Sequence, residues 1–203
     1  MPASGTKNRR MQNISLSDGI ITLSPLHPDD AEAHLAGEDE VLVRWLSGTN
    51  GTRDGVTAYL RHCQQQWDTG GPLQAFGIRV GADNVLAGTI DLRWATDNAR
   101  PGLVPLAYGL YPHYRRRGLA TRAVLVACRY VASEGGTHAI IRVAPDNVAS
   151  AAVARRAGFA ADTYTYGQDG TRLECYTRDV RSIPTAPSAV TTSEQHNLRR
   201  WSR

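Results

Sequence analysis

The sequence predicts one α/β domain of the α+β kind, built on a mixed and mostly antiparallel sheet, and three observations support this prediction. The chain has 203 residues, a length at which one domain can bury a continuous core. Segments of period two alternate with segments of helical period, in the order strand, two helices, three strands, helix, strand, helix, two strands. Two hairpin turns make antiparallel neighbours, whereas helical crossovers require parallel ones.

The N-terminal part is predicted to hold a strand followed by two helices. Residues 20–26 form the strand, and Pro28 opens the first helix with two acids behind it, because proline suits a first turn and acids suit the positive end of the helix dipole. The second helix spans 52–68 and ends at Gly70 and Gly71. Its apolar side chains recur at helical spacing: Val56, Tyr59, Leu60, Cys63 and Trp67.

Three strands follow the second helix. Residues 73–80 and 85–94 are predicted to be strands, and the Gly-Ala-Asp-Asn turn that joins them at 81–84 is the signal of a hairpin. Residues 104–111 form the next strand, which ends at Pro112 because proline cannot donate a ladder hydrogen bond.

The C-terminal part is predicted to contain two helices and three strands. The clearest helix spans 119–133, where the apolar residues form one stripe and two glycines end it. Residues 138–143 form a strand that is nearly free of polar residues, which favours a buried central position. A short helix over 148–157 precedes two strands, 159–166 and 171–180, which a Gly-Gln-Asp-Gly turn joins.

Both ends of the chain are predicted to lie outside the domain, which we place at 19–182. Residues 1–18 are predicted to be a flexible leader and residues 183–203 a weakly structured tail. The net charge is +4, but residues 1–10 and 181–203 carry +3 each, so the body of the protein is slightly acidic. A nucleic-acid footprint needs basic residues clustered on the folded body, so nucleic acid is not expected as a partner unless it binds through the basic tails.

The composition excludes several other classes of protein. Hydrophobic residues make up 41% and charged residues 21%, as in ordinary globular proteins. No apolar run approaches the ~18 residues of a membrane span, and the N-terminus lacks the apolar region of a secretory signal, so no membrane partner is expected. The three cysteines show no C-x-x-C spacing, which argues against a disulfide framework or a cysteine metal site. A cytoplasmic protein without a metal is therefore expected.

The segment that says most about chemistry is a basic loop at the start of a helix. Residues 113–118, His-Tyr-Arg-Arg-Arg-Gly, lie between the strand 104–111 and the helix 119–133. The first N–H groups of a helix have no intrahelical partner and lie at the positive end of its dipole. A glycine there lets an anion approach the backbone closely. The loop therefore predicts a pyrophosphate site. The alternative is that the three arginines are ordinary surface residues at the start of a helix.

This loop resembles the signature of the GNAT superfamily of acyl-CoA-dependent N-acetyltransferases, which reads Gln/Arg-x-x-Gly-x-Gly/Ala. Arg115, Gly118 and Ala120 occupy its defined positions, and the loop follows a strand and opens a helix, as the family requires. The wider sequence over 107–159 looks most like the branch that contains the ribosomal-protein N-terminal acetyltransferases. The resemblance implies an enzyme with acetyl-CoA as co-substrate and an amine as acceptor.

The resemblance also implies a sheet splayed like a V between the strands 104–111 and 138–143, flanked by about four helices, with acetyl-CoA in the cleft. Its pantetheine amides would pair with the strand backbone that the splay leaves free. Its pyrophosphate would sit on the N–H groups of residues 116–121, and Asn147 would bond the pantetheine arm. The implied contacts of acetyl-CoA are Leu110, Tyr111, Arg115, Arg116, Arg117, Gly118, Leu119, Ala120, Thr121, Asn147 and Ser150.

Acetyl transfer to an amine needs a deprotonated amine, hydrogen-bond donors for the thioester oxygen and, in many relatives, an acid for the departing thiolate. The tyrosine that supplies this acid in many relatives is Ala154 here. The branch noted above often uses a serine three residues after the asparagine, and Ser150 occupies that position on the same helical face as Asn147. Ser150 is therefore the candidate acid, and its alternative is an ordinary helix serine.

The general base is less defined. Many relatives place a glutamate on the strand before the signature loop, but the sequence has no Asp or Glu between Asp97 and Glu134. Asp91 and Glu174, both on predicted strands, are the candidates. Each also fits an ordinary strand carboxylate, and a water relay without a dedicated base is an equal alternative.

The acceptor is the least defined part of the prediction. An acidic run between Asp29 and Glu40 could attract a cationic amine or could face solvent as ordinary helix-start acids. Three functions stay open: acetylation of a protein N-terminus, which we favour, acetylation of a small amine such as an antibiotic or polyamine, and acyl-CoA binding without catalysis. The family often forms dimers, so the resemblance leaves both a monomer and a homodimer open.

Overall fold

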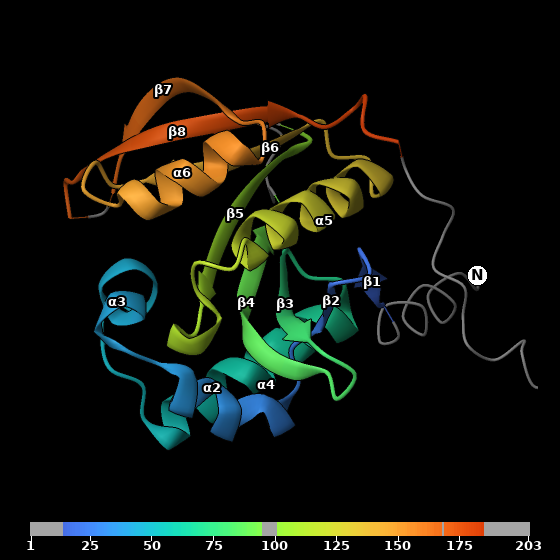
Figure 1. Cartoon of the computed structure of the whole chain (residues 1–203), viewed down its shortest axis with the longest axis vertical. Coiled ribbons are helices and arrows are strands. Elements are labelled where there is room, and N and C mark those ends of the chain that lie inside the picture. The colour runs from blue at the N-terminus through green and yellow to red at the C-terminus, as the bar shows by residue number, and fades with distance from the viewer. Residues whose placement is uncertain (1–13, 95–100, 168, 185–203) are drawn as a thin grey trace, which may run out of the picture.

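The computed structural model describes residues 14–94, 101–167 and 169–184. The first 13 residues of the expected leader and residues 185–203 of the expected tail lie outside the described residues. Figure 1 shows the described chain as one twisted sheet with helices on both of its faces.

All strands of the described residues belong to one sheet of eight, in the order β1-β2-β3-β4-β5-β6-β8-β7. The strands are β1 Leu16–Ser17, β2 Ile21–Pro25, β3 Leu73–Val80, β4 Val85–Arg93, β5 Leu103–Leu110, β6 His138–Val143, β7 Ala160–Tyr166 and β8 Arg172–Asp179. Every neighbouring pair is antiparallel except β5 and β6, which are parallel. The mixed, mostly antiparallel sheet predicted from the sequence is confirmed.

Five α-helices and three short helical segments flank the sheet in the described residues. They are η1 Pro28–Asp30, α2 Ala31–Gly37, α3 Glu40–Leu42, η2 Val43–Ser47, α4 Arg53–Thr69, η3 Pro112–Tyr114, α5 Leu119–Ser133 and α6 Val148–Arg156. Helices α5 and α6 lie against one face of the sheet, and α2 and α4 lie against the other (Figure 1).

The core has two layers because strand side chains alternate between the faces of a sheet. On β3, Phe76 and Ile78 face the layer under α5, whereas Leu73 and Ala75 face the layer under α4. On β4, Ile90 belongs to the α5 layer. From Thr89 onward, the odd-numbered residues of β4 therefore face the α2 and α4 side, and these are the polar residues Thr89, Asp91 and Arg93.

The two parallel strands separate toward their carboxyl ends. Their register runs from Leu103 and His138 to Leu106 and Ile141. Beyond this point β5 continues to Leu110 in pairing with β4, and β6 continues to Val143 in pairing with β8. The V-shaped splay expected between these strands is thus present, and it opens on the side where α5 begins.

Strand β1, helix α3 and the turn η2 are not predicted from the sequence. Strand β1 lies within the segment expected to be a leader, and it pairs with β2 while Ile14 and Leu16 pack on the core. Helix α3 and the π-helical turn η2 lie within 39–47, where no helix was predicted. These short elements depend on distant partners, which a local pattern does not reveal.

The three cysteines, Cys63, Cys128 and Cys175, are buried and free. Among the described residues, no helix is long and apolar enough to cross a membrane.

Candidate active site

The N-terminus of α5 forms an exposed backbone cradle. Gly118 is its N-cap, with a φ of 76° and no side-chain cap, and Arg116 also has a positive φ of 59°. The first intrahelical bond described runs from Arg122 N to Gly118 O at 3.2 Å, so the preceding N–H groups have no partner in the helix. A Cβ placed on Gly118 would meet no atom within 4 Å. The cradle therefore has both the donors and the room that a pyrophosphate needs.

The signature arginines divide into two kinds. Arg116 and Arg117 are exposed beside the cradle. Arg115 is turned into the protein, where its Nε donates to Leu110 O at 2.9 Å and its two terminal nitrogens donate to the Asp39 carboxylate at 2.7 and 2.6 Å. The Arg115 guanidinium therefore stabilises the fold at this loop, whereas the charges of Arg116 and Arg117 are available to bind an anion.

Asn147 and Ser150 lie at the start of α6, across the splay from β5. Asn147 is the N-cap, and its side-chain oxygen accepts a hydrogen bond from Ser150 N at 3.0 Å, which leaves its amide nitrogen free to donate to another group. The Ser150 hydroxyl lies 3.0 Å from the Tyr108 hydroxyl, which also bonds Ser150 O at 3.2 Å. This hydroxyl pair joins β5 to α6. Ala154, at the position of the usual tyrosine acid, is fully buried.

A cavity of about 500 Å³ lies on the α2 and α4 side of the sheet. Its walls are α2, α3, η2, α4 and the loop that follows η2. Its floor is formed by five residues of β4 and β5: Thr89, Asp91, Arg93, Ala107 and Gly109. Six ionisable side chains line it: His34, Glu38, Tyr59, Asp91, Arg93 and Tyr111. The cavity is large enough for a small amine or for the first residues of a peptide.

Asp91 is the buried carboxylate of this cavity. Its side chain is 14% exposed, and the Tyr59 hydroxyl donates toward its two oxygens at 3.3 Å each. Burial raises the pKa of Asp91 to about 6, although the Tyr59 hydrogen bond and the Arg93 charge 3.8 Å away act in the opposite direction. A carboxylate with this pKa is ionised at neutral pH and is still basic enough to accept a proton.

Glu174, the other base candidate, lies elsewhere. It is an exposed residue of β8 that accepts a hydrogen bond from the Tyr176 hydroxyl at 3.0 Å, and it does not line the cavity. Of the two carboxylates, the structure brings only Asp91 to the cavity.

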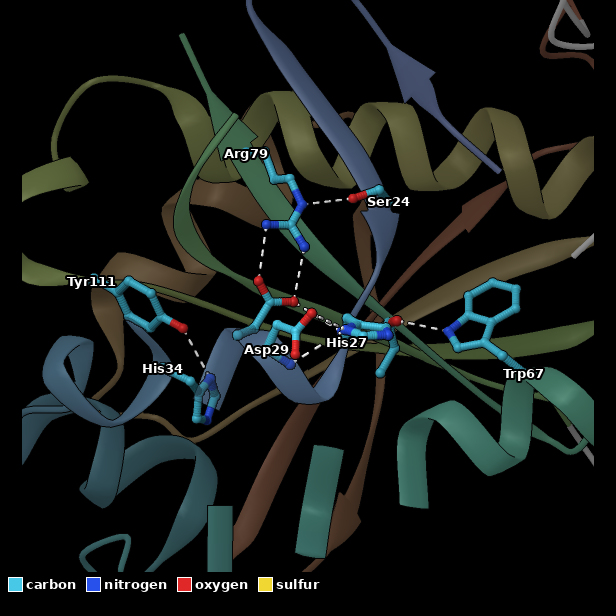
Figure 2. A network of polar contacts seen from close by, with 9 residues as sticks. Ser24, His27, Asp29, His34, Trp67, Arg79 and Tyr111 are labelled. Carbon is cyan, nitrogen blue, oxygen red and sulfur yellow. Dashed lines mark hydrogen bonds and ion pairs between the residues drawn. The ribbon is translucent and has the colours of Figure 1, made fainter. Parts of the chain in front are cut away.

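His34 and Tyr111 form a polar pair that the sequence analysis did not assign to the acceptor side. The His34 Nδ1 lies 2.9 Å from the Tyr111 hydroxyl, and Figure 2 shows the two side chains pointing toward one another. The Tyr111 ring packs on Gly37, where any side chain would collide with it. Burial lowers the pKa of His34 despite the nearby carboxylates of Glu38 and Asp30, so its imidazole is neutral at neutral pH.

Most of the acidic run serves the fold rather than the cavity. Asp30 pairs with Arg79, Asp39 with Arg115, and Glu32 with Arg53. Glu38 does line the cavity, but its carboxylate accepts hydrogen bonds from Gly51 N and the Ser47 hydroxyl. In the described residues, no three His, Cys, Asp or Glu side chains gather into a group that could hold a metal ion.

The fold has many solved relatives. An α-N-acetyltransferase of ribosomal protein L7/L12, in complex with coenzyme A, matches with a TM-score of 0.72 and 15% identity, over 83% of this chain and 99% of the other. A ribosomal-protein-S5-alanine acetyltransferase from Vibrio fischeri matches with a TM-score of 0.70 and 16% identity, over 84% and 98%. An aminoglycoside acetyltransferase in complex with coenzyme A matches with a TM-score of 0.66 and 16% identity, over 78% and 94%.

No curated protein matches the sequence. The family model described as "Acetyltransferase (GNAT) domain" matches residues 21–160, which include β2, the cavity, the splay, the cradle and α6. The chain therefore belongs to the GNAT family of acetyltransferases, enzymes that use acetyl-CoA as co-substrate.

Proposed function

We propose that this protein transfers the acetyl group of acetyl-CoA to a primary amine in the cavity beside Asp91, and that the preferred acceptor is the N-terminus of a protein. The observation that carries the proposal is the position of Asp91, a buried carboxylate with a raised pKa on β4, next to the strand that borders the splay. Two ribosomal-protein acetyltransferases share the fold, which supports the choice of acceptor.

The residues around the splay have separate tasks in this proposal. The N–H groups at 116–121, with the charges of Arg116 and Arg117, bind the pyrophosphate of acetyl-CoA. The β5 backbone beyond Leu106 is available to pair with the pantetheine arm, and the free amide nitrogen of Asn147 donates to the same arm. Acetyl-CoA supplies the reactive thioester, and binding in the splay brings that thioester next to the cavity.

Two protons move during the transfer. The acceptor amine reaches the site as an ammonium ion and must lose a proton before its lone pair can attack. Asp91 accepts this proton, directly or through one water molecule, because its pKa of about 6 leaves it ionised at neutral pH. The Ser150 hydroxyl donates a proton to the departing sulfur and takes one from the Tyr108 hydroxyl through their hydrogen bond. The acceptor nitrogen loses its second proton as the amide forms, and this proton returns through water to the Tyr108 oxygen, so both hydroxyls are restored.

A small cationic amine is the second candidate acceptor. Two carboxylates, those of Glu38 and Asp91, line one cavity, which favours a positively charged ligand. An aminoglycoside acetyltransferase also shares the fold.

Release of free thiol from acetyl-CoA tests the function and separates the two acceptors. The panel contains peptides with a free N-terminus, the same peptides with an acetylated N-terminus, spermidine and an aminoglycoside. We expect thiol release with the free peptides only. Release with spermidine or the aminoglycoside alone would move the acceptor to the small-amine class, and no release with any amine would leave an acyl-CoA-binding protein without catalysis.

Gly118→Asp is expected to weaken acetyl-CoA binding by about 10- to 100-fold in isothermal titration calorimetry. The new carboxylate would stand beside the pyrophosphate, where like charges a few ångströms apart repel by several kcal/mol at partial exposure. Gly135→Asp is the matched control, since Gly135 follows the other end of α5 with a φ of 85° and a Cβ there meets nothing within 4 Å. Equal affinity of the two variants for acetyl-CoA would show that the pyrophosphate does not bind at this cradle.

Ser150→Ala is expected to lower kcat by about 10²- to 10⁴-fold and to lower the affinity for acetyl-CoA much less, because an acid acts in the transition state rather than in ground-state binding. Tyr108→Phe keeps the ring and removes the partner hydroxyl, so its effect on kcat should be smaller. Ser133→Ala is the control, a helix serine whose hydroxyl bonds only Tyr130 O among the contacts described. A kcat for Ser150→Ala equal to that of the control would show that Ser150 is an ordinary helix serine without a role as an acid.

A further inference from the structure

Arg115 links two parts of the protein that are far apart in the sequence. It belongs to the loop between η3 and α5, directly before the cradle. Its bidentate partner, Asp39, precedes α3, and both side chains are 28% exposed. The guanidinium also donates a hydrogen bond to Leu110 O, at the end of β5. One side chain thus joins the acetyl-CoA loop, the last residue of β5 and the start of α3.

Asp39 in turn determines where α3 lies. Its carboxylate caps the helix by accepting a hydrogen bond from Leu42 N at 3.0 Å, and its backbone oxygen accepts one from Val43 N at 2.9 Å. The Arg115 guanidinium beside it holds the pKa of the Asp39 carboxyl below its usual range, so the ion pair persists at mildly acidic pH. Bidentate arginine–carboxylate pairs fix geometry as well as charge.

The segment that Asp39 anchors is a wall of the cavity. Leu42 and Leu46 line the cavity, and both lie so close to Gly109 on β5 that any side chain there would collide with them. The position of α3 and η2 therefore sets the width of the cavity above β5. The chain runs without interruption from Arg115 into the cradle, where two of the next three residues have a positive φ.

We propose that Arg115 is a positioning residue for the acceptor cavity and that its ion pair with Asp39 couples acetyl-CoA binding at the cradle to the wall formed by α3 and η2. This inference rests on the proposed function, because it takes the cradle as the acetyl-CoA site and the cavity as the acceptor site. It assigns the first arginine of the signature loop to the acceptor side. When acetyl-CoA binds and orders the loop, it also fixes the position of α3 and η2. By linkage, an acceptor that fixes α3 and η2 raises the affinity for acetyl-CoA by the same factor by which acetyl-CoA raises the affinity for the acceptor.

Hydrogen–deuterium exchange with acetyl-CoA as the probe tests the coupling without a known acceptor. In the wild-type protein, saturating acetyl-CoA is expected to slow amide exchange over residues 40–48 about 5-fold or more, although these residues are outside the cradle. In Arg115→Gln this protection should be lost, while calorimetry still shows binding. Asp39→Asn, which keeps a side chain that can cap α3, should behave like Arg115→Gln, and the double variant should add nothing further.

Arg116→Gln and Arg117→Gln are the matched controls from the same loop. They should weaken acetyl-CoA binding, yet at saturation they should keep the protection of 40–48. Equal protection in Arg115→Gln and in the wild-type protein would overturn the inference and leave the proposed function intact. A wild-type protein that binds no acetyl-CoA would overturn the proposed function and, with it, this inference.

Discussion

Asp91→Asn is expected to lower kcat by about 10²- to 10⁴-fold, the range typical for loss of a general base. The amide has nearly the shape of the carboxylate but cannot accept the proton of an acceptor ammonium ion. In the wild-type enzyme, kcat/KM should fall as the pH drops below about 6, because protonation of Asp91 removes the base. The measurement is thiol release at pH 5 to 9 for both proteins. In the variant only an acceptor that is already deprotonated reacts, so the acidic limb should move up to the pKa of the amine itself, about 8 for a protein N-terminus.

The same substitution is expected to stabilise the protein at neutral pH. The pKa of Asp91 is about 6 in the folded state, above its ordinary value of 3.8, so the folded protein binds the proton more tightly than the unfolded chain. The stability from this group is complete below the ordinary pKa and is lost as the pH rises through the folded-state pKa. Asp91→Asn should therefore raise the free energy of unfolding by about 1–3 kcal/mol at pH 8 and have little effect at pH 4.

Glu174→Gln is the matched control for both measurements. It removes the charge of the other strand carboxylate, which is exposed on β8 and bonded to Tyr176. We expect nearly wild-type kcat and an unfolding free energy within about 0.5 kcal/mol of wild type, as for most surface substitutions. A loss of kcat in Glu174→Gln without one in Asp91→Asn would mean that Glu174, and not Asp91, is the general base. An unchanged kcat in both variants would favour a water relay without a dedicated base.

The sequence predicted the part of the site whose signals are local. The cradle follows from a glycine and arginines at the start of a strongly apolar helix, and the structure has that helix at Leu119–Ser133. The sequence also indicates on which face of the sheet Asp91 lies. Since strand residues alternate, Thr89, Asp91 and Arg93 had to face away from the apolar Ile90 and Leu92.

The rest of the site depends on contacts between distant residues. Helix α3 is only three residues long, and its N-cap residue Asp39 pairs with Arg115, which lies 76 positions away in the sequence. His34 and Tyr59 lie on helices whose spacing gave no sign that these two side chains face one cavity, and Tyr59 was assigned to the apolar stripe of its helix. The hydroxyl of Tyr59 reaches Asp91 only because α4 packs across the sheet at that point.

Arg79→Ala is expected to cost about 3–5 kcal/mol of unfolding free energy, the usual result of breaking a buried ion pair on one side. Arg79 on β3 donates to both oxygens of Asp30 at 3.0 and 2.8 Å, and the two side chains are 16% and 11% exposed. Its Nε donates to the Ser24 hydroxyl at 2.7 Å (Figure 2). The Asp30 carboxylate also accepts from His27 N, which closes the turn before α2.

Urea unfolding followed by circular dichroism measures this loss, and Arg53→Ala is the control. Arg53 pairs with Glu32 on the surface, where both side chains are mostly exposed, so its removal should cost less than about 1 kcal/mol. The large cost at Arg79 arises because Asp30 would keep a buried charge without its partner, at the point where β2 turns into α2. Since α2 carries His34 to the cavity, Arg79→Ala should also raise amide exchange at residues 31–37 more than Arg53→Ala does. Equal losses in the two variants would mean that water reaches Asp30 and replaces the guanidinium.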